Sequence, residues 1–201
     1  MHKLANFSSD LGKVHFEGLV HLLIFIRYNN NLGLNYYAGI NDAPVSDLLR
    51  QASINTENQL MAFSDSSCKY FLETGRSTGA YIIVYQGGPI DHGTHVPVPV
   101  FQSSSESEYN AACTAGITLA HFKMLIHELL NKDPDVVPEE DPLVIVDSKS
   151  YVCMAKNGKY TKHTIHFARR MHFLRNGEKC KMQTSFTPLY FVHLAFFSMR
   201  Y

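Results

Sequence analysis

Apolar residues form two short runs along the chain, and each run ends at an aspartate. Residues 61–64 lead to Asp65, and residues 143–146 lead to Asp147. Apolar runs of this length, bounded by polar residues, are typical of short buried strands. Each of these two strands is therefore expected to present one carboxylate at its end.

A second pattern lies between these runs. Residues 75–86 follow the first run after a turn, and their side chains alternate in a way that predicts another strand. Residues 90–101 include Pro97 and Pro99, which cannot donate a hydrogen bond to a neighbouring strand. A third strand there is expected to lie at a sheet edge or to be broken.

Helical spacing of apolar residues marks three further segments. Residues 14–28 predict a helix, and a longer helix begins at Ser105 with a stripe that should lie on the sheet. That stripe consists of Tyr109, Ala112, Cys113, Gly116, Ile117, Ala120, Met124, Ile126, His127 and Leu130. Residues 161–175 predict a basic helix, residues 34–40 predict a strand, and residues 43–57 predict a loop or short helix.

The composition supports a folded core. The chain has 201 residues, 45% of them hydrophobic and 12% aromatic, which argues against general disorder. Its four cysteines show no paired metal-ligand spacing, so we expect reduced thiols in an intracellular, cytoplasmic protein. The last apolar segment is too short to span a bilayer, although a role at a membrane surface stays open.

Two strands that end in Asp and a helix that begins near Glu108 can bring three acids to one place. Three converging carboxylates repel one another, and divalent metal best offsets that repulsion. Each acid also has a simpler interpretation. Ser105 and Glu108 have the spacing of a capping box, and Asp147 precedes residues that could form a helix capped by it. Glu106 is roughly 200° round the helix from Glu108, so we expect it to be solvated.

Five short motifs carry a resemblance to a known family. They are residues 63–66 (FSDS), 75–81 (GRSTGAY), 104–112 (SSESEYNAA), 146–150 (VDSKS) and 161–163 (TKH). In their order and spacing the chain resembles the ribonuclease H domain of the Pol polyprotein of copia-type LTR retrotransposons. Residues upstream of these motifs look like the end of the preceding reverse transcriptase region.

The resemblance implies a fold and a division of the chain. The fold is α/β: a ribonuclease H-like mixed sheet of three antiparallel strands plus a parallel strand, flanked by helices and truncated at its C-terminus. Residues 1–58 would be the end of the reverse transcriptase or connection region, and they would either pack on the nuclease or extend without their polymerase. Residues 59–182 would be the ribonuclease H-like domain, and residues 183–201 a degenerate tail read out of frame, recruited as an apolar cover or strand.

The resemblance also implies chemistry. The family hydrolyses the RNA strand of an RNA–DNA hybrid during reverse transcription, with two Mg²⁺ ions or with Mn²⁺. Asp65 would bridge both ions, Glu108 would hold one, and Asp147 would help to hold the metal and the scissile phosphate. The expected partners are the hybrid and the reverse transcriptase portion of the parent polyprotein, in a virus-like particle where the element is intact.

Two departures from the family pattern weaken this expectation. The family carries a fourth metal-binding acid on its last helix, but this chain has no acid after Glu178. The family usually has Trp at the position of Cys68, and this chain has no Trp. The two-metal site is therefore expected to be incomplete. The alternative is a non-catalytic transposon remnant that only folds or binds nucleic acid, whereas no motif favours a small-molecule enzyme.

The net charge of zero hides an uneven distribution of charge. Residues 156–181 are strongly basic, and such a block is either a solvated face or a contact surface for phosphates. The nucleic-acid-binding candidates are Ser66, Lys162, Arg169, Arg170 and Arg175. His92 and His95 are expected at the surface, with a metal-binding His pair as the alternative.

Overall fold

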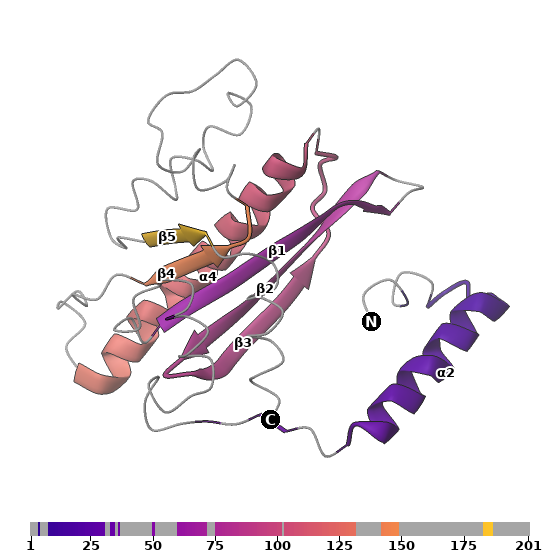
Figure 1. The fold of residues 1–201 in the computed structure, drawn as a ribbon, viewed down its shortest axis with the longest axis horizontal. Helices are drawn as coiled ribbons and strands as arrows, with labels where there is room; N and C mark the ends of the chain where they lie inside the picture. Colours follow the sequence, from indigo (N-terminus) through magenta and orange to yellow (C-terminus); the bar gives the residue numbers. More distant parts are fainter. Residues whose placement is uncertain are drawn as a thin grey trace.

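The computed structural model describes residues 8–30, 60–71, 75–101, 103–131, 142–148 and 183–186, together with residues 4, 33, 34, 36 and 50. Figure 1 shows the elements α2 (Lys13–Tyr28), β1 (Leu60–Phe71), β2 (Arg76–Tyr85), β3 (Gly88–His95), α4 (Ser104–Asn131), β4 (Leu143–Val146) and β5 (Gln183–Phe186). The helices predicted at residues 14–28 and from Ser105 are confirmed. The predictions for residues 161–175, and for residues 34–57 apart from 34, 36 and 50, fall outside this description.

The strands form one five-stranded sheet in the order β3-β2-β1-β4-β5. Strands β1, β2 and β3 are antiparallel neighbours, whereas β4 pairs with β1 in parallel and β5 pairs with β4 in parallel. The predicted mixed sheet of three antiparallel strands and a parallel strand is confirmed. A second parallel strand lies beyond β4, in the segment 183–201 for which a recruited cover or strand was expected. It consists of the 4 residues of β5, so the sheet continues into the segment predicted to be a degenerate tail.

Strand β3 lies at one edge of the sheet, and it spans Gly88–His95 instead of the predicted residues 90–101, so Pro97 and Pro99 lie outside it. It ends at His95, two residues before Pro97. An edge strand has one side without a neighbouring strand. A proline, which lacks the N–H donor, is tolerated on that side because no hydrogen bond between strands is lost. The prolines therefore limit the strand to the segment that precedes them.

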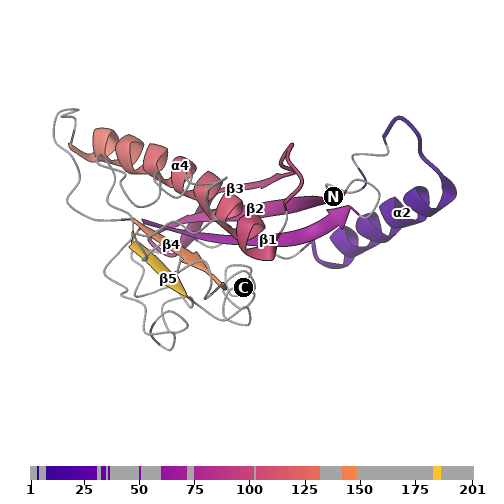
Figure 2. The ribbon, with the colours of Figure 1, turned by 90° about the horizontal axis from the view of Figure 1, so that it is seen from above.

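Helix α4 covers one face of the sheet and crosses β1, β2 and β4 (Figure 2). Its apolar stripe packs there because residues three and four apart share one side of a helix. The buried core cluster consists of Leu60, Ala62, Ile83, Tyr109, Ala112, Cys113, Ala115, Leu119, Val144 and Val146. Three residues of the predicted stripe, Ile117, Met124 and Leu130, are exposed instead. The sheet-facing arc is narrower than predicted, and Ile117 lies outside it with 56% of its surface exposed.

Two glycines on neighbouring strands leave room for the rings of His95 and Tyr81. Gly79 of β2 lies opposite His95 of β3, and Gly93 lies opposite Tyr81. A Cβ at Gly79 would lie 2.6 Å from His95 Cε1 and 3.2 Å from the Cβ of Ala111. A Cβ at Gly93 would lie 2.6 Å from Tyr81 Cε1. Each ring therefore occupies space that only an opposing glycine leaves open.

Substitution of Gly79 by alanine should lower the free energy of unfolding by about 1–3 kcal/mol, since it forces an overpacked contact with a ring and a helix. Gly33→Ala is the matched control, because nothing lies within 4 Å of a Cβ there. We expect the control to be neutral or slightly stabilising. Urea denaturation of the two variants measures the difference, and equal midpoints would contradict the packing argument.

Candidate metal centre

The register between β1 and β4 places two carboxylates side by side. The parallel pairing runs from Met61 opposite Leu143 to Ser64 opposite Val146. Asp65 and Asp147 are the next residue on each strand. Parallel strands in register direct equivalent side chains to the same side of the sheet. The backbone pairing alone therefore brings these two acids to one end of the sheet.

Glu108 comes from the first turns of α4, and the way this helix begins leaves its side chain free. Ser103 is the cap: its Oγ accepts a hydrogen bond from the Glu106 amide at 3.2 Å, and its carbonyl accepts one from the Ser107 amide at 3.2 Å. The alternative interpretation, in which Ser105 and Glu108 form a capping box, is not met, because the cap lies two positions earlier. Glu106 is the third helical residue and is 7% exposed, so the prediction that it is solvated is also wrong.

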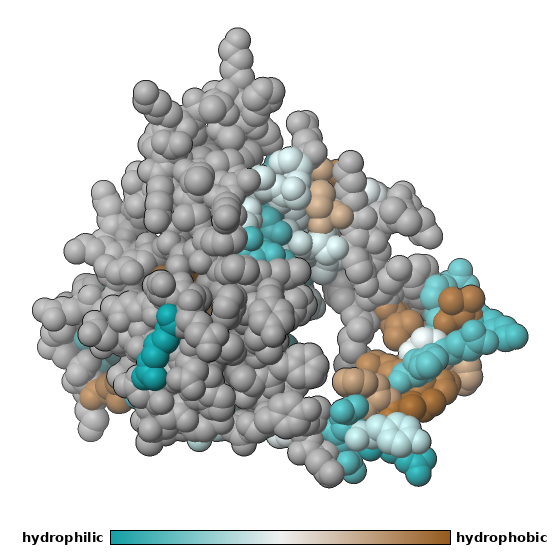
Figure 3. All heavy atoms as spheres, viewed as in Figure 1, coloured by the Kyte–Doolittle hydropathy of each residue, from teal (hydrophilic) through white to brown (hydrophobic). Residues whose placement is uncertain are grey.

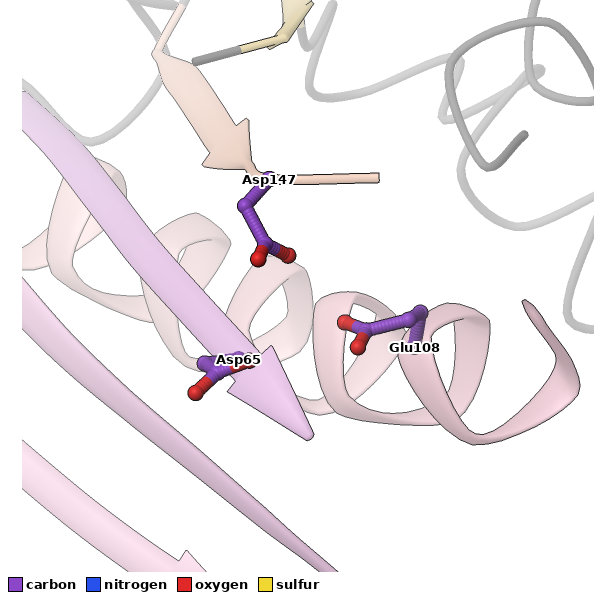
Figure 4. Close-up of side chains that lie close together, drawn as sticks. All are labelled: Asp65, Glu108 and Asp147. Atoms are coloured by element: carbon purple, nitrogen blue, oxygen red, sulfur yellow. The ribbon is translucent and has the colours of Figure 1, made fainter. Parts of the chain in front are cut away.

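The three carboxyl groups converge. One oxygen each from Asp65, Glu108 and Asp147 lies within 4.8 Å of the others. Figure 4 shows the three side chains gathered at one place, with Asp65 on β1, Glu108 on the first turns of α4 and Asp147 directly after β4. Asp65 lies in the middle of β1, which continues to Phe71, so the prediction that this strand ends at Asp65 is wrong. The convergence expected from the sequence is present, while the roles of these residues in catalysis stay predictions.

The Glu108 carboxyl group is held in an unfavourable place for a negative charge. Its pKa is raised from 4.5 to about 8, first by burial and then by the nearby carboxylates of Asp65 and Asp147. The approach of the Ser66 amide and hydroxyl lowers this pKa by less. Glu108 is 9% exposed, and its Oε2 is buried with no hydrogen-bond partner. A proton, a hydrogen-bond donor or a cation can satisfy an oxygen in that position.

Ser66 lies at the same site. The Ser66 amide donates a hydrogen bond of 2.8 Å to Asp65 Oδ1, which fixes that carboxylate. The Ser66 hydroxyl group is buried beside the Glu108 carboxyl group and lowers its pKa.

The donor set fits a hard divalent cation. All three candidate ligands are carboxylates, and oxygen ligands suit Mg²⁺ and Mn²⁺ better than softer metals. The unpartnered Glu108 Oε2 supplies the free ligand atom that such an ion needs. A second ion would need more ligands. The described residues contain one cluster of this kind, and the sequence offers no acid beyond Glu178.

The structure also describes residues whose position the sequence did not reveal. His95 was predicted at the surface, but it is half-buried, and its Nε2 lies 3.2 Å from Asn110 Nδ2 and 3.4 Å from Thr114 Oγ1. The signal that could have located it is Gly79, the small residue that lies opposite. His92 is exposed, as predicted. The candidates Lys162, Arg169, Arg170 and Arg175 lie outside the described residues.

Comparison with known proteins gives one clear relative by sequence. No family model matches the chain. It is similar to the Retrovirus-related Pol polyprotein from transposon TNT 1-94 of Nicotiana tabacum, with 26% identity over 172 residues. The match covers 86% of this chain and 11% of the relative, so the chain spans about a tenth of that polyprotein. The predicted resemblance to a retrotransposon Pol polyprotein is confirmed.

Solved structures with a similar arrangement are ribonucleases H. RNase H1 from the archaeon Halobacterium salinarum has a TM-score of 0.48 at 14% identity, covering 67% of this chain and 89% of its own. LC11-RNase H1, solved in complex with an RNA/DNA hybrid, has a TM-score of 0.44 at 13% identity, covering 65% and 86%. At these values the likeness carries no argument by itself. The ribonuclease H-like fold follows from the strand order and registers described above.

The raised pKa of Glu108 predicts a pH dependence of stability in metal-free solution. Between pH 4.5 and about 8, Glu108 is protonated in the folded chain and ionised in the unfolded chain. The folded state then binds more protons, so its stability is fully present at low pH and falls as pH rises toward 8. We expect a loss on the order of a few kcal/mol in urea denaturation with EDTA. Glu108→Gln, which stays neutral, should flatten this part of the curve.

Mg²⁺ should reverse the loss, because carboxylates bind metal in the ionised form. At pH 8, Mg²⁺ should raise the free energy of unfolding of the parent chain and raise that of Glu108→Gln much less. The control Glu128→Gln removes an exposed carboxylate from the same helix and should respond to Mg²⁺ like the parent. An equal response in all three chains would argue against a metal at this cluster.

Proposed function

We propose that the chain is the ribonuclease H-type domain of a copia-type retrotransposon Pol polyprotein, with weak metal-dependent hydrolysis of the RNA strand of RNA–DNA hybrids. The observation that carries this proposal is the convergence of three carboxylates within 4.8 Å around a buried, unpartnered Glu108 oxygen. The Pol polyprotein relative supports the retrotransposon origin. The proposal includes the reverse transcriptase portion as a covalent neighbour and an intracellular site of action.

Asp65, Glu108 and Asp147 are the residues that would hold Mg²⁺ or Mn²⁺. Bound divalent cations activate water at neutral pH and stabilise the attacking and leaving oxygens of a phosphodiester. Asp65 is suited to the central position because the Ser66 amide holds its Oδ1. Burial of Glu108 excludes water from its carboxylate and strengthens its attraction to a cation. Asp147 completes the set at the end of β4.

Ser66 is the candidate for recognition of the RNA strand. Its hydroxyl group lies beside the acids and can both donate and accept a hydrogen bond. The 2′-hydroxyl both donates and accepts hydrogen bonds, and it distinguishes RNA from DNA. A serine hydroxyl next to the metal-binding acids is chemically suited to that contact.

Hydrolysis by the isolated chain should be slow. Loss of one electrostatic partner at such a site commonly lowers the rate about 10²–10³-fold, and no acid after Glu178 can replace the family's fourth. The rate of hydrolysis is measured as cleavage of a labelled RNA–DNA hybrid in Mg²⁺ or Mn²⁺, with Asp65→Asn as the inactive control. A rate equal to that of an intact family member, abolished by Asp65→Asn, would show that three acids suffice.

Residues 156–181 should supply weak binding to the hybrid that depends on salt and not on sequence, because counterion release drives such binding. Replacement of Arg169 and Arg170 by Glu should weaken the affinity and flatten the plot of log K against log salt. Arg27→Glu, which reverses an exposed charge on α2, is the control and should change neither. Fluorescence anisotropy at several salt concentrations gives both quantities. Affinity independent of salt would contradict a role for this block.

A non-catalytic remnant is the second candidate, and the absence of acids after Glu178 is the observation that favours it. The same two assays separate the candidates. Salt-dependent binding of the hybrid, without cleavage above that of Asp65→Asn, would identify the chain as a non-catalytic remnant.

A further inference from the structure

The His95 ring links strand β3 to the amino-terminal part of α4. Its Nε2 atom lies 3.2 Å from Asn110 Nδ2 and 3.4 Å from Thr114 Oγ1, and both of these partners belong to α4. Asn110 follows the metal-ligand candidate Glu108 by two residues. The contact therefore joins the edge of the sheet to the helical segment that carries one of the three acids.

His95 belongs to a row of residues that crosses three strands. Gly79 of β2 pairs with Ser66 of β1 on one side and with His95 of β3 on the other. Residues directly opposite one another in antiparallel strands point to the same face of the sheet. Helix α4 covers this face, because a Cβ at Gly79 would lie 3.2 Å from the Cβ of Ala111. Ser66, at the other end of the row, lies beside the Glu108 carboxyl group.

Three residues of α4 meet this row in order. Glu108 lies beside Ser66, Ala111 lies over Gly79, and Thr114 lies beside His95. Residues three apart on a helix are turned by roughly 60° from one another, so these three cross the underside of α4 from one flank to the other. Glu108 and the His95 contact therefore lie on opposite flanks, with the close contact between Gly79 and Ala111 at the centre.

This arrangement makes the position of Glu108 depend on the rotation of α4 about its own axis. The three acids repel one another, and Glu108 Oε2 has no hydrogen-bond partner that would hold it against this repulsion. A rotation that moved Glu108 away from the other acids would also move Asn110 and Thr114 relative to His95. Hydrogen bonds weaken steeply when their distances and angles change, so the His95 contact resists such a rotation.

Either neutral form of the His95 ring can make this contact. With its proton on Nδ1, the ring accepts a hydrogen bond at Nε2 from the Asn110 amide. With its proton on Nε2, the ring donates to Thr114 Oγ1, whose own proton is donated to the Asn110 carbonyl oxygen at 3.1 Å. One hydrogen bond between β3 and α4 is therefore kept in both forms.

We propose that His95 is a positioning residue for the metal centre. Its contact with α4 fixes the rotation of the helix, and that rotation holds the Glu108 carboxylate beside Asp65 and Asp147. This inference rests on the proposed metal centre, to which it adds a residue of the edge strand that touches none of the three acids' own strands.

The affinity of the full chain for Mn²⁺ tests the proposal without any measurement of hydrolysis. His95→Phe keeps a ring in the space beside Gly79 and removes its hydrogen bonds, whereas His95→Gln keeps a group that can donate or accept. His92→Phe is the matched control, because His92 is exposed on the same strand. Water proton relaxation measures bound Mn²⁺, including weak binding, and circular dichroism checks that each variant is folded.

We expect His95→Phe to raise the Kd for Mn²⁺ about 10-fold, the lower end of the effect of groups that orient metal ligands. His95→Gln and His92→Phe should bind Mn²⁺ like the parent chain. Asn110→Leu removes the amide from the helix side and should weaken binding as His95→Phe does, which also provides the test if phenylalanine prevents folding. Equal affinity in the parent, His95→Phe and Asn110→Leu would overturn the proposal.

A second comparison separates positioning of Glu108 from a general loosening of the fold. In a Glu108→Gln chain the ligand that His95 positions is already lost, so His95→Phe should have no further effect on Mn²⁺ binding. A further loss by the same factor in that chain would overturn the proposal. Absence of saturable Mn²⁺ binding by the parent would instead refute the metal centre itself, and this inference with it.

Discussion

The parallel register between β1 and β4 is the constraint on which the rest of the site depends. Asp65 and Asp147 lie together only because Ser64 pairs with Val146, one residue before both acids. Side chains alternate along a strand, so a slip of one residue would turn one acid to the other face. The buried apolar residues of both strands prevent that slip, since it would also expose Val144 or Val146 of the core.

The site concentrates charge that the fold does not neutralise by itself. Two aspartates and burial act together on Glu108 and raise its pKa. The packing of α4 on β1, β2 and β4 holds the three acids in spite of their repulsion. Instability confined to one end of a well-packed sheet is typical of a site whose ligand completes it.

Strand β5 and helix α2 differ from the central strands in the interactions that they make. Strand β5 joins the sheet through main-chain pairing with β4, which requires little of its side chains. Helix α2 contributes nothing to the core, and its apolar residues face outward (Figure 3). None of the helices in the described part of the chain has the length and apolarity to cross a membrane. The sheet and α4 therefore form their own core, to which α2 contributes no buried residue.

The sequence by itself determined the elements and the candidate acids. Period-two and continuous apolar runs predicted β1, β2 and β4, helical spacing predicted α4, and prolines predicted that β3 is an edge. These signals are local, because burial of one face sets the spacing along each segment. The resemblance of the motifs to those of a known family added a prediction of which carboxylates come together.

Tertiary structure decided what local spacing leaves open. Ser103 and Ser105 both suit a helix cap, and only the position of α4 on the sheet selects Ser103 and leaves Glu108 free. His95 became half-buried because Gly79, on another strand, makes room for its ring. Strand β5 pairs with β4 through backbone groups that every residue carries, so a side-chain pattern does not show which strand it pairs with. The pKa of Glu108 likewise depends on neighbours 43 and 39 positions away in the chain, Asp65 and Asp147, which no local window contains.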